Sequence, residues 1–186
     1  MGTIFAFLLL FAGIFAYFIT GDAPVDTWSH EWILPSDEDS ASLDKKIDDL
    51  RERIEQADSG EMFSLNISQE EATSKLHCLC RDGNISLNMK NPQIYFHDGM
   101  IQAFVKMDVL IDIEVAFEVQ MLVEGGKLNS IPQKLYLGKI PIPRSVVDTV
   151  VTALEREFEK QGEEMTIDLY DIDIDTGFMI VTLVKR

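Results

Sequence analysis

The chain has 186 residues, enough for one folded domain with appendages but too few for two domains of ordinary size. Its 32 acidic residues outnumber its 16 basic ones, and the formal net charge is −16. Binding to nucleic acid requires a basic surface, so this composition argues against nucleic acid as a partner. The same charge repels anionic lipid headgroups, and contact with lipid must therefore depend on the burial of apolar groups.

The amino-terminal segment has the composition of a membrane-spanning helix. Residues 3–20 carry no charge and are almost wholly apolar, and about 17 to 25 such residues span a bilayer core. No basic residue precedes the segment, and Pro24 follows the one small-residue cleavage point, Ala23. We therefore expect an uncleaved transmembrane anchor over residues 1–20 rather than a removed signal peptide.

The charges that follow the anchor predict its orientation. Acidic residues begin at Asp22, whereas the first basic residue is Lys45. Segments poor in basic residues are the ones that are translocated. The sequence thus predicts a single-pass protein of the cell membrane with an extracytoplasmic carboxy-terminal domain, joined to its anchor by an acidic tether over residues 21–42.

A short amphipathic helix is predicted over residues 43–58. Its apolar residues follow heptad spacing, which favours a parallel pair of helices and therefore a homodimer. The residues at the contact positions are Leu43, Ile47, Leu50 and Ile54. Two heptads are marginal for a coiled coil, so a helix packed on its own domain, or a free-standing spacer helix, stays open as an alternative.

The folded domain is predicted to cover residues 61–186. It begins with a strand over residues 62–67 and a short helix whose capping box pairs Ser68 with Glu71. Asp98 and Gly99 then form the tight turn of a hairpin. The helix is expected to end before Asp82, and alternating apolar residues predict strands on both sides of the hairpin turn.

The longest pattern of the chain is the segment IQAFVKMDVLIDIEVAFEVQMLV, residues 101–123. Every odd position in it is apolar, and alternate side chains of a strand share one face. One straight strand of this length would extend for about 75 Å, which is too long for a small domain. We therefore expect the chain either to bend sharply or to fold back near residues 108–112, with one long curved apolar wall in both cases.

A helix rich in valine follows the next strand and a proline-rich approach, and it opens at Pro143 or Arg144. Valine has a low helix propensity, so this helix must be held by packing, and the apolar wall is its natural counterpart. Its apolar positions are Val146, Val147, Val150, Val151, Leu154 and Phe158. A final hairpin turns at Thr176 and Gly177 and completes the domain.

Catalytic patterns are missing from the sequence. The three histidines lie far apart in the chain, and the sequence contains no nucleophile elbow, no glycine-rich phosphate loop and no HExxH motif. His77, Cys78 and Cys80 lack a fourth ligand at zinc-site spacing. We therefore predict no enzymatic activity, no cofactor and no metal site.

An acidic hairpin imitates part of a calcium-binding loop. Asp171, Asp173 and Asp175 match its first half, but the sixth and twelfth positions hold Thr176 and Thr182 instead of Gly and Glu. The intervening isoleucines suit a strand. A strand with a solvated acidic face is the expectation, and a weak calcium site over residues 171–177 is the alternative.

These elements predict an α+β fold. A strongly curved antiparallel sheet would wrap around a long carboxy-terminal amphipathic helix and a short amino-terminal helix, preceded by the transmembrane helix and the acidic spacer helix. The apolar area exceeds what two helices cover, which implies either a second sheet layer or a groove for an apolar ligand, and an ordinary packed core is the further alternative. The residue pattern by itself leaves these alternatives open.

The order of these motifs resembles a family of bacterial envelope proteins. The run L-G-K-I-P-I-P at residues 137–143, the valine-rich helix, the capped helix at Ser68 and the turn at Asp98 and Gly99 carry the resemblance. It is to YpmS-type and LmeA-like proteins, short relatives of the TULIP lipid-binding superfamily, and it covers residues 61–186.

The resemblance implies an elongated apolar cavity between sheet and helix that takes lipid tails. The residues implied to line it are Val105, Val109, Ile113, Phe117, Met121, Val147, Val151, Leu154 and Phe158. The predicted function is non-catalytic binding of a phospholipid or lipid-linked glycan by a membrane-anchored, extracytoplasmic protein. The alternative is a structural or scaffolding envelope protein with a fully packed core, acting through the helix at residues 43–58.

Overall fold

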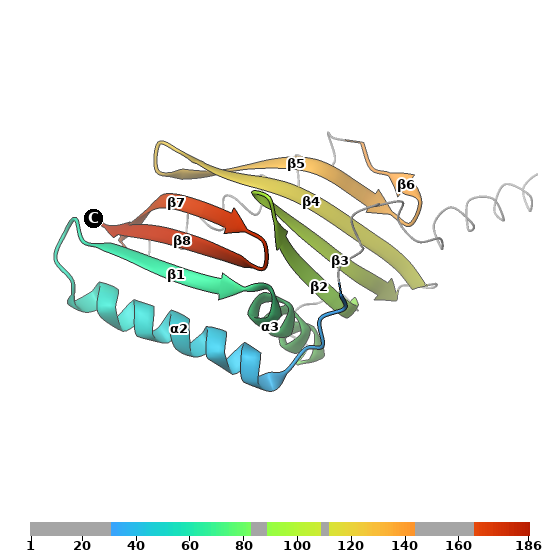
Figure 1. Ribbon diagram of the computed structural model, residues 1–186, viewed down its shortest axis with the longest axis horizontal. Helices are drawn as coiled ribbons and strands as arrows, with labels where there is room; N and C mark the ends of the chain where they lie inside the picture. The colour runs from blue at the N-terminus through green and yellow to red at the C-terminus, as the bar shows by residue number, and fades with distance from the viewer. Residues whose placement is uncertain (1–30, 83–88, 109–111, 144–165) are drawn as a thin grey trace, which may run out of the picture.

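The structure is a computed structural model that describes residues 31–82, 89–108, 112–143 and 166–186 (Figure 1). In the described residues two helices flank the first strand, and seven further strands follow them. In order they are α2 (Asp37–Gln56), β1 (Met62–Ser68), α3 (Gln69–Arg81), β2 (Met89–His97), β3 (Met100–Asp108), β4 (Asp112–Glu124), β5 (Lys127–Leu137), β6 (Ile140–Pro141), β7 (Ile167–Asp175) and β8 (Phe178–Lys185).

The strands form two antiparallel sheets. One has three strands in the order β1-β8-β7, and the other has five in the order β2-β3-β4-β5-β6. The turns of two hairpins join the sheets, because Gly99 N–H donates to Ile174 O and Gly177 N–H donates to Phe96 O, each at 3.0 Å. The smaller sheet also lies beside the β4–β5 hairpin, as Figure 1 shows.

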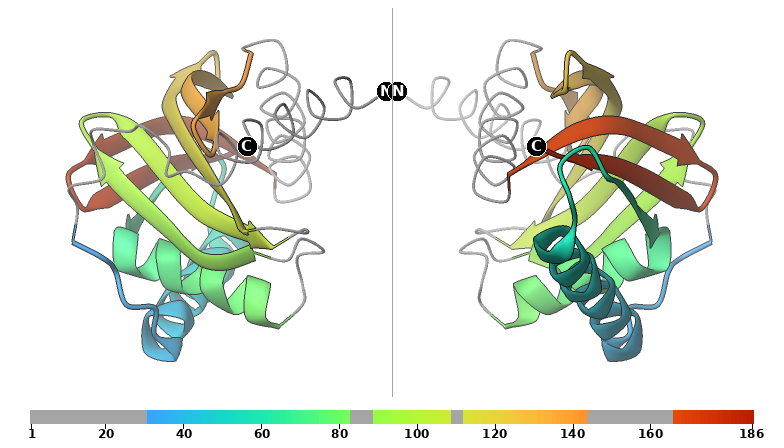
Figure 2. Two further views of the ribbon diagram at one scale, coloured as in Figure 1. Left: turned by 90° about the vertical axis from the view of Figure 1, so that its right-hand side faces the viewer. Right: turned by 90° about the vertical axis from the view of Figure 1, so that its left-hand side faces the viewer.

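Helix α2 packs along the three-stranded sheet (Figures 1 and 2). Ser36 caps its amino terminus, with Oγ accepting from Asp39 N–H at 3.0 Å. Its apolar stripe enters the main hydrophobic cluster of the described residues. The buried members of that cluster are Leu50, Ile54, Phe63, Ile167, Leu169 and Leu183. The helix therefore packs on its own chain, and it begins earlier than the sequence predicts.

This packing occupies most of the predicted dimer stripe. Leu43, Leu50 and Ile54 are buried within the chain, and Ile47 is half-buried. Packing of the helix on its own domain was one of the alternatives left open by the heptad spacing. The homodimer through these residues stays a prediction.

Helix α3 follows β1 directly and covers the edge of β2. Its predicted capping box is confirmed: Ser68 Oγ accepts from Glu71 N–H at 3.2 Å, and Glu71 Oε2 accepts from Ser68 N–H at 3.1 Å. Thr73, fully buried, bonds through its hydroxyl to both the N–H and the C=O of Ile94, at 2.9 and 3.2 Å. These bonds satisfy groups on β2 that no neighbouring strand reaches.

The predicted turns are confirmed, and the long apolar segment folds back, which is one of the two outcomes expected for it. Strands β3 and β4 pair antiparallel, with Asp108 opposite Asp112. The β2–β3 turn uses Asp98 and Gly99, whose φ angles are 46° and 78°. Two positive φ values are the requirement of a tight hairpin turn, which suits this Asp-Gly pair.

The predicted fold class is wrong. A single curved sheet around a long carboxy-terminal helix was expected, whereas the described residues form two sheets, and both helices among them precede β2. Alternation of apolar residues determines the faces of a strand but not its neighbours, and the β7–β8 hairpin pairs with β1 rather than with β2–β6. The helix predicted from residue 143 or 144 to 158 falls almost wholly outside the described residues.

The predictions of a transmembrane helix, a single-pass protein and a location in the cell membrane are contradicted as well. Within residues 31–82, 89–108, 112–143 and 166–186, no helix is both long enough and apolar enough to cross a bilayer. The longest of them, α2, carries charged residues on most of its surface. The segment predicted as the anchor, residues 1–20, lies outside the described residues.

Candidate apolar ligand-binding face

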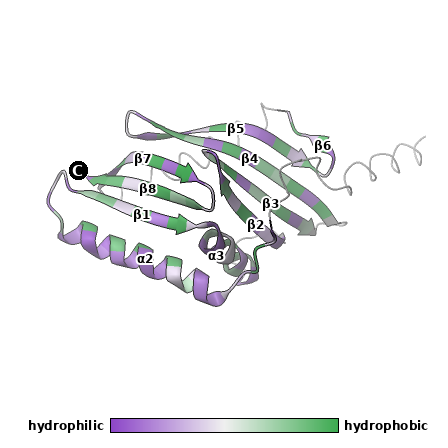
Figure 3. Ribbon diagram, viewed as in Figure 1, coloured by the Kyte–Doolittle hydropathy of each residue, from purple (hydrophilic) through white to green (hydrophobic). Residues whose placement is uncertain are grey.

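The five-stranded sheet has one face made almost entirely of apolar side chains. Directly paired residues of neighbouring strands share a face, and the register places Ala103 opposite Phe117 and Phe117 opposite Leu135. We call this surface the apolar face. Its residues are Ile94, Phe96, Ile101, Ala103, Val105, Met107, Ile113, Val115, Phe117, Val119, Met121, Leu135 and Leu137. Figure 3 shows the resulting alternation of apolar and polar residues along β3 and β4.

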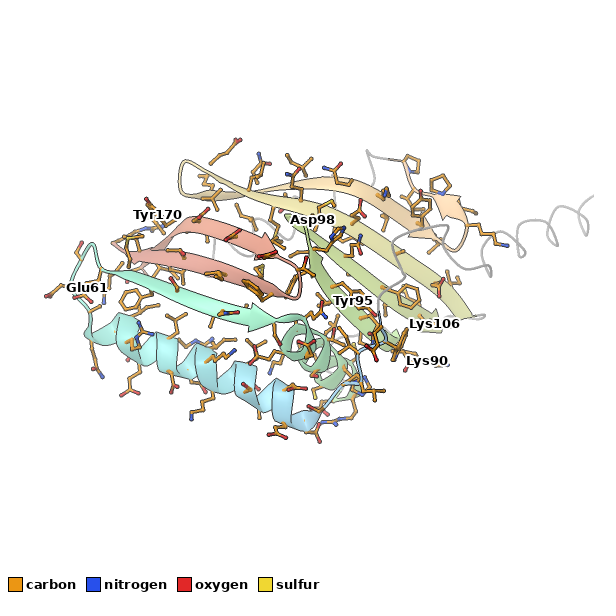
Figure 4. All side chains as sticks on the ribbon, in the orientation of Figure 1. Glu61, Lys90, Tyr95, Asp98, Lys106 and Tyr170 are labelled. Carbon is orange, nitrogen blue, oxygen red and sulfur yellow. The ribbon has the colours of Figure 1, made fainter. Side chains whose placement is uncertain are left out.

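The opposite face carries a row of polar side chains. The register aligns Tyr95, Gln102, Glu118 and Lys134 across four neighbouring strands. Gln102 Nε2 donates to Glu118 Oε2 at 2.9 Å, and Lys134 Nζ lies 3.3 Å from Glu118 Oε1. Burial raises the pKa of Tyr95 above its usual value. We call this surface the polar face, and Tyr95 is labelled on it in Figure 4.

The segment before α2 covers part of the polar face. The Gln93 side-chain amide accepts from Ile33 N–H at 2.9 Å and donates to Ile33 O at 3.0 Å. The Trp32 ring meets the Phe104 ring edge-on, with centroids 6.1 Å apart. Residues 31–36 therefore close this side of the sheet through a two-point hydrogen bond and an aromatic contact.

Burial within the five-stranded sheet does not follow polarity. Gln93 and Gln102, on the polar face, are fully buried and Glu118 is only 5% exposed. Val105, Ile113 and Phe117, on the apolar face, are half-buried. Buried polar groups are costly and apolar groups usually lie inside, so the partial accessibility of these three apolar side chains requires a reason.

Accessibility changes along the apolar face. Phe96 and Val119, at the end next to the three-stranded sheet, are 1% and 3% exposed. From the five-stranded sheet, only Val123 and Leu128 pack against the main hydrophobic cluster of the described residues. The middle of the face and its far end, at Met107 and Ile113, lie outside that cluster and keep half-buried side chains.

The structure brings together four of the residues predicted to line a lipid cavity. Val105, Ile113, Phe117 and Met121 lie on the apolar face. The other five lie outside the described residues, namely Val109, Val147, Val151, Leu154 and Phe158. Leu135 and Leu137 were missed because the shift in register between Glu118 and Val119 interrupts the simple alternation along β5.

Two small hollows are lined mainly by residues outside the apolar face, and Leu135 is the one residue of that face in their linings. One, of about 220 Å³, is lined by residues of β5 and β6 that include Lys134, Tyr136 and Pro141. The other, of about 260 Å³, lies between α2 and α3, where Asp37, Asp44 and Lys75 contribute to its lining. Sites for small molecules usually measure about 300 to 1,000 Å³. The apolar face is therefore the stronger candidate for a binding surface.

The described residues contain little reactive chemistry. No group of three His, Cys, Asp or Glu side chains among them is placed to hold a metal ion. Cys78 and Cys80 on α3 are free thiols, and burial raises the pKa of Cys80. The candidate site thus offers apolar contact area rather than acid, base or nucleophile.

Comparisons with models of protein families, with curated proteins and with solved structures found no match for this chain. The resemblance to the YpmS-type and LmeA-like family accordingly stays a prediction. Function is inferred from geometry alone.

Proposed function

We propose that the chain binds an apolar ligand, a lipid or a lipid-linked glycan, on the apolar face of the five-stranded sheet. One observation carries this proposal: Val105, Ile113 and Phe117 keep half-buried side chains while Gln102 and Glu118, on the opposite face, are buried. A continuous apolar face whose side chains stay partly accessible is a feature of grooves that bind apolar ligands. The proposed role is to hold the ligand without chemical change.

The size of the face suits a hydrocarbon chain. From Ile113 to Val119 the strand extends for about 20 Å. Each methylene group that leaves water contributes about 0.8 kcal/mol, so a chain of about ten methylenes supplies about 8 kcal/mol before the entropy cost of binding. This is enough for binding without any charged contact. A chain with a net charge of −16 repels anionic headgroups, so its binding of lipid must depend on apolar burial.

The alternative prediction, a scaffold acting through the helix at residues 43–58, has no observation of this kind in its favour. Leu50 and Ile54 of that helix are already buried in the main hydrophobic cluster of their own chain. A scaffold would need this stripe to be available to another molecule. Ligand binding on the apolar face makes no such demand.

Extraction of lipid from the full-length chain tests the proposal. We expect organic extracts of the purified protein to contain a stoichiometric lipid by mass spectrometry, and the protein to take up a fluorescent fatty acid. Phe117→Asp should abolish uptake, because a carboxylate on the apolar face removes the favourable burial.

Leu122→Asp is the matched control. Leu122 lies on the same strand, β4, but its side chain is on the opposite face from Phe117 and is 37% exposed. It should keep normal uptake, and circular dichroism of both variants should show an unchanged fold. A protein that is reproducibly empty, or equal uptake by the two variants, would count against lipid binding on this face.

A further inference from the structure

Three outer sheet edges among the described residues are protected by neighbouring structure. Thr73 of α3 satisfies the backbone of Ile94 on the edge of β2. The β2–β3 turn reaches β7, where Gly99 N–H donates to Ile174 O. On β5, the short strand β6 pairs beside Tyr136, and proline stands at position 132. Such devices prevent a foreign strand from pairing with an exposed edge.

Strand β1 forms the remaining edge, and its hydrogen bonds show which groups point outward. Lys185 N–H donates to Glu61 O at 3.0 Å, so Glu61 faces β8. Backbone groups alternate in direction along an antiparallel strand, which directs those of Met62, Ser64 and Asn66 away from β8. Asn66 O confirms this assignment, because it accepts from Lys46 Nζ of α2 at 3.0 Å.

The outward groups of Met62 and Ser64 have no hydrogen-bond partner within the described residues. Both side chains are exposed, and Met62 is 54% exposed. Residues 62–66 contain no proline and no charged residue, and Lys46 of α2 bonds to this edge at Asn66 O, beyond Ser64. It therefore presents free N–H and C=O groups in the spacing that an added strand requires.

A cation lies beside this free edge. The Arg53 guanidinium lies over the ring of Phe63, with its carbon 5.4 Å from the ring centroid. Arg53 is exposed, and in the described part of the chain it has no carboxylate partner, whereas Lys46 is paired with Glu71 at 2.7 Å. Arg53 can thus pair with an acidic group that arrives next to Phe63.

We propose that the outer edge of β1 binds an extended peptide by strand addition. The N–H and C=O groups of Met62 and Ser64 bond to the peptide backbone, and a carboxylate opposite Phe63 pairs with Arg53. Side chains of an added strand alternate, so only residues opposite Phe63 and Leu65 face α2 and Arg53. Those opposite Met62 and Ser64 face the other side and contact Met62.

Charge distinguishes this occupant from a second copy of the chain. Pairing of two identical edges would bring together two molecules that each carry a net charge of −16, and this repulsion opposes association. A short segment of low net charge with one well-placed carboxylate avoids most of that repulsion. The site is separate from the apolar face, so its failure would leave the proposed function standing.

The probe is the peptide fluoresceinyl-Ser-Val-Thr-Glu-Thr-Val-Ser-amide, labelled at its amino terminus and titrated with the full-length chain while anisotropy is followed. Its partner peptide carries Gln in place of Glu. We expect saturable binding of the Glu peptide and weaker binding of the Gln peptide. Arg53→Gln should remove the difference between the two peptides, because the charged pair is then lost.

Variants at Ser64 test the backbone contact. Ser64→Pro removes an outward N–H that takes no part in the β1–β8 ladder, whereas Ser64→Ala keeps it. We expect Ser64→Pro to weaken peptide binding about tenfold and Ser64→Ala to leave it unchanged. Thermal unfolding of both variants checks that the sheet is intact.

Three results would overturn the proposal. They are absence of saturable binding by the Glu peptide, equal affinity of Ser64→Pro and Ser64→Ala, and a dimer of the wild-type chain in sedimentation that Ser64→Pro dissociates. The last result would assign the edge of β1 to a second copy of the chain.

Discussion

Gln102 Nε2 donates a 2.9 Å hydrogen bond to Glu118 Oε2, and both side chains are buried on the polar face of the five-stranded sheet. The other polar atom of the amide, Gln102 Oε1, is buried and has no hydrogen-bond partner among the residues that the structure describes. Lys134 supplies the second contact to Glu118, at 3.3 Å. Stability on this face therefore depends on whether each polar atom is paired.

Removing one member of this pair should destabilise the fold. Glu118→Leu leaves Gln102 Nε2 buried without an acceptor, which costs about 1 to 3 kcal/mol of unfolding free energy. The double variant Gln102→Leu, Glu118→Leu should recover part of this loss, since the buried amide of Gln102 is then absent and the half-exposed Lys134 can be solvated. Urea denaturation of the four proteins gives the coupling energy. Strictly additive losses would show that the hydrogen bond contributes nothing.

Gln93 is expected to anchor residues 31–36. Its amide makes both hydrogen bonds to the backbone of Ile33, so Gln93→Ala should lower the unfolding free energy by about 1 to 3 kcal/mol. It should also make residues 31–36 more sensitive to limited proteolysis. Gln133→Ala, at an exposed position on β5, is the control. Identical digestion patterns for the two variants would argue against anchoring by Gln93.

Glu71 should contribute stability that depends on pH. Burial tends to raise the pKa of Glu71, but hydrogen bonds from Lys46, Ser42 and Ser68 outweigh it and hold the pKa below its usual value. A lowered folded-state pKa stabilises the fold above the unfolded pKa of about 4.3, and this contribution is lost as pH falls through the folded value.

The corresponding variant is Glu71→Gln, with Glu70→Gln at the exposed neighbouring position as control. Glu71→Gln should be about 1 to 3 kcal/mol less stable than wild type at pH 7. The difference should shrink below about pH 4. A difference that stays constant from pH 7 to pH 3 would exclude ionisation of Glu71 as its source.

Helix α2 should be an integral part of the fold. Leu50 is 6% exposed within the main hydrophobic cluster, and Leu50→Ala should cost about 2 to 5 kcal/mol by leaving a cavity. Ile47→Ala, at the half-buried position of the same stripe, should cost less. Denaturant unfolding measures both. A larger effect at Ile47 would indicate that the stripe is used outside the chain.

Local structure was largely predictable from the residues. The capping box of Ser68 and Glu71, the turn at Asp98 and Gly99 and the fold-back of residues 101–123 depend on contacts between residues close in sequence. The alternation along β3 and β4 also identified the apolar face, including Phe117. Short-range hydrogen bonds and strand periodicity suffice for features of this kind.

Burial of polar residues was not predictable. Ala72, Leu76 and Leu79 share one face of α3 by their spacing, but the most buried residues of this helix are Glu71, Thr73 and Ser74. The reason is tertiary, because Thr73 bonds to the edge of β2 and Ser74 Oγ accepts from Ser36 N–H at 3.0 Å. A polar side chain can be buried where a distant segment satisfies it.

The sequence by itself determined the charge, the strands and turns, and the existence of one long apolar face. Only the tertiary structure decided that the β7–β8 hairpin joins β1 in a separate sheet, that α2 packs on that sheet, and that residues 31–36 close the polar face. The physical reason is the range of the interactions. Periodicity records which side of an element is apolar, whereas its partners are chosen by hydrogen bonds and packing between residues far apart in the chain.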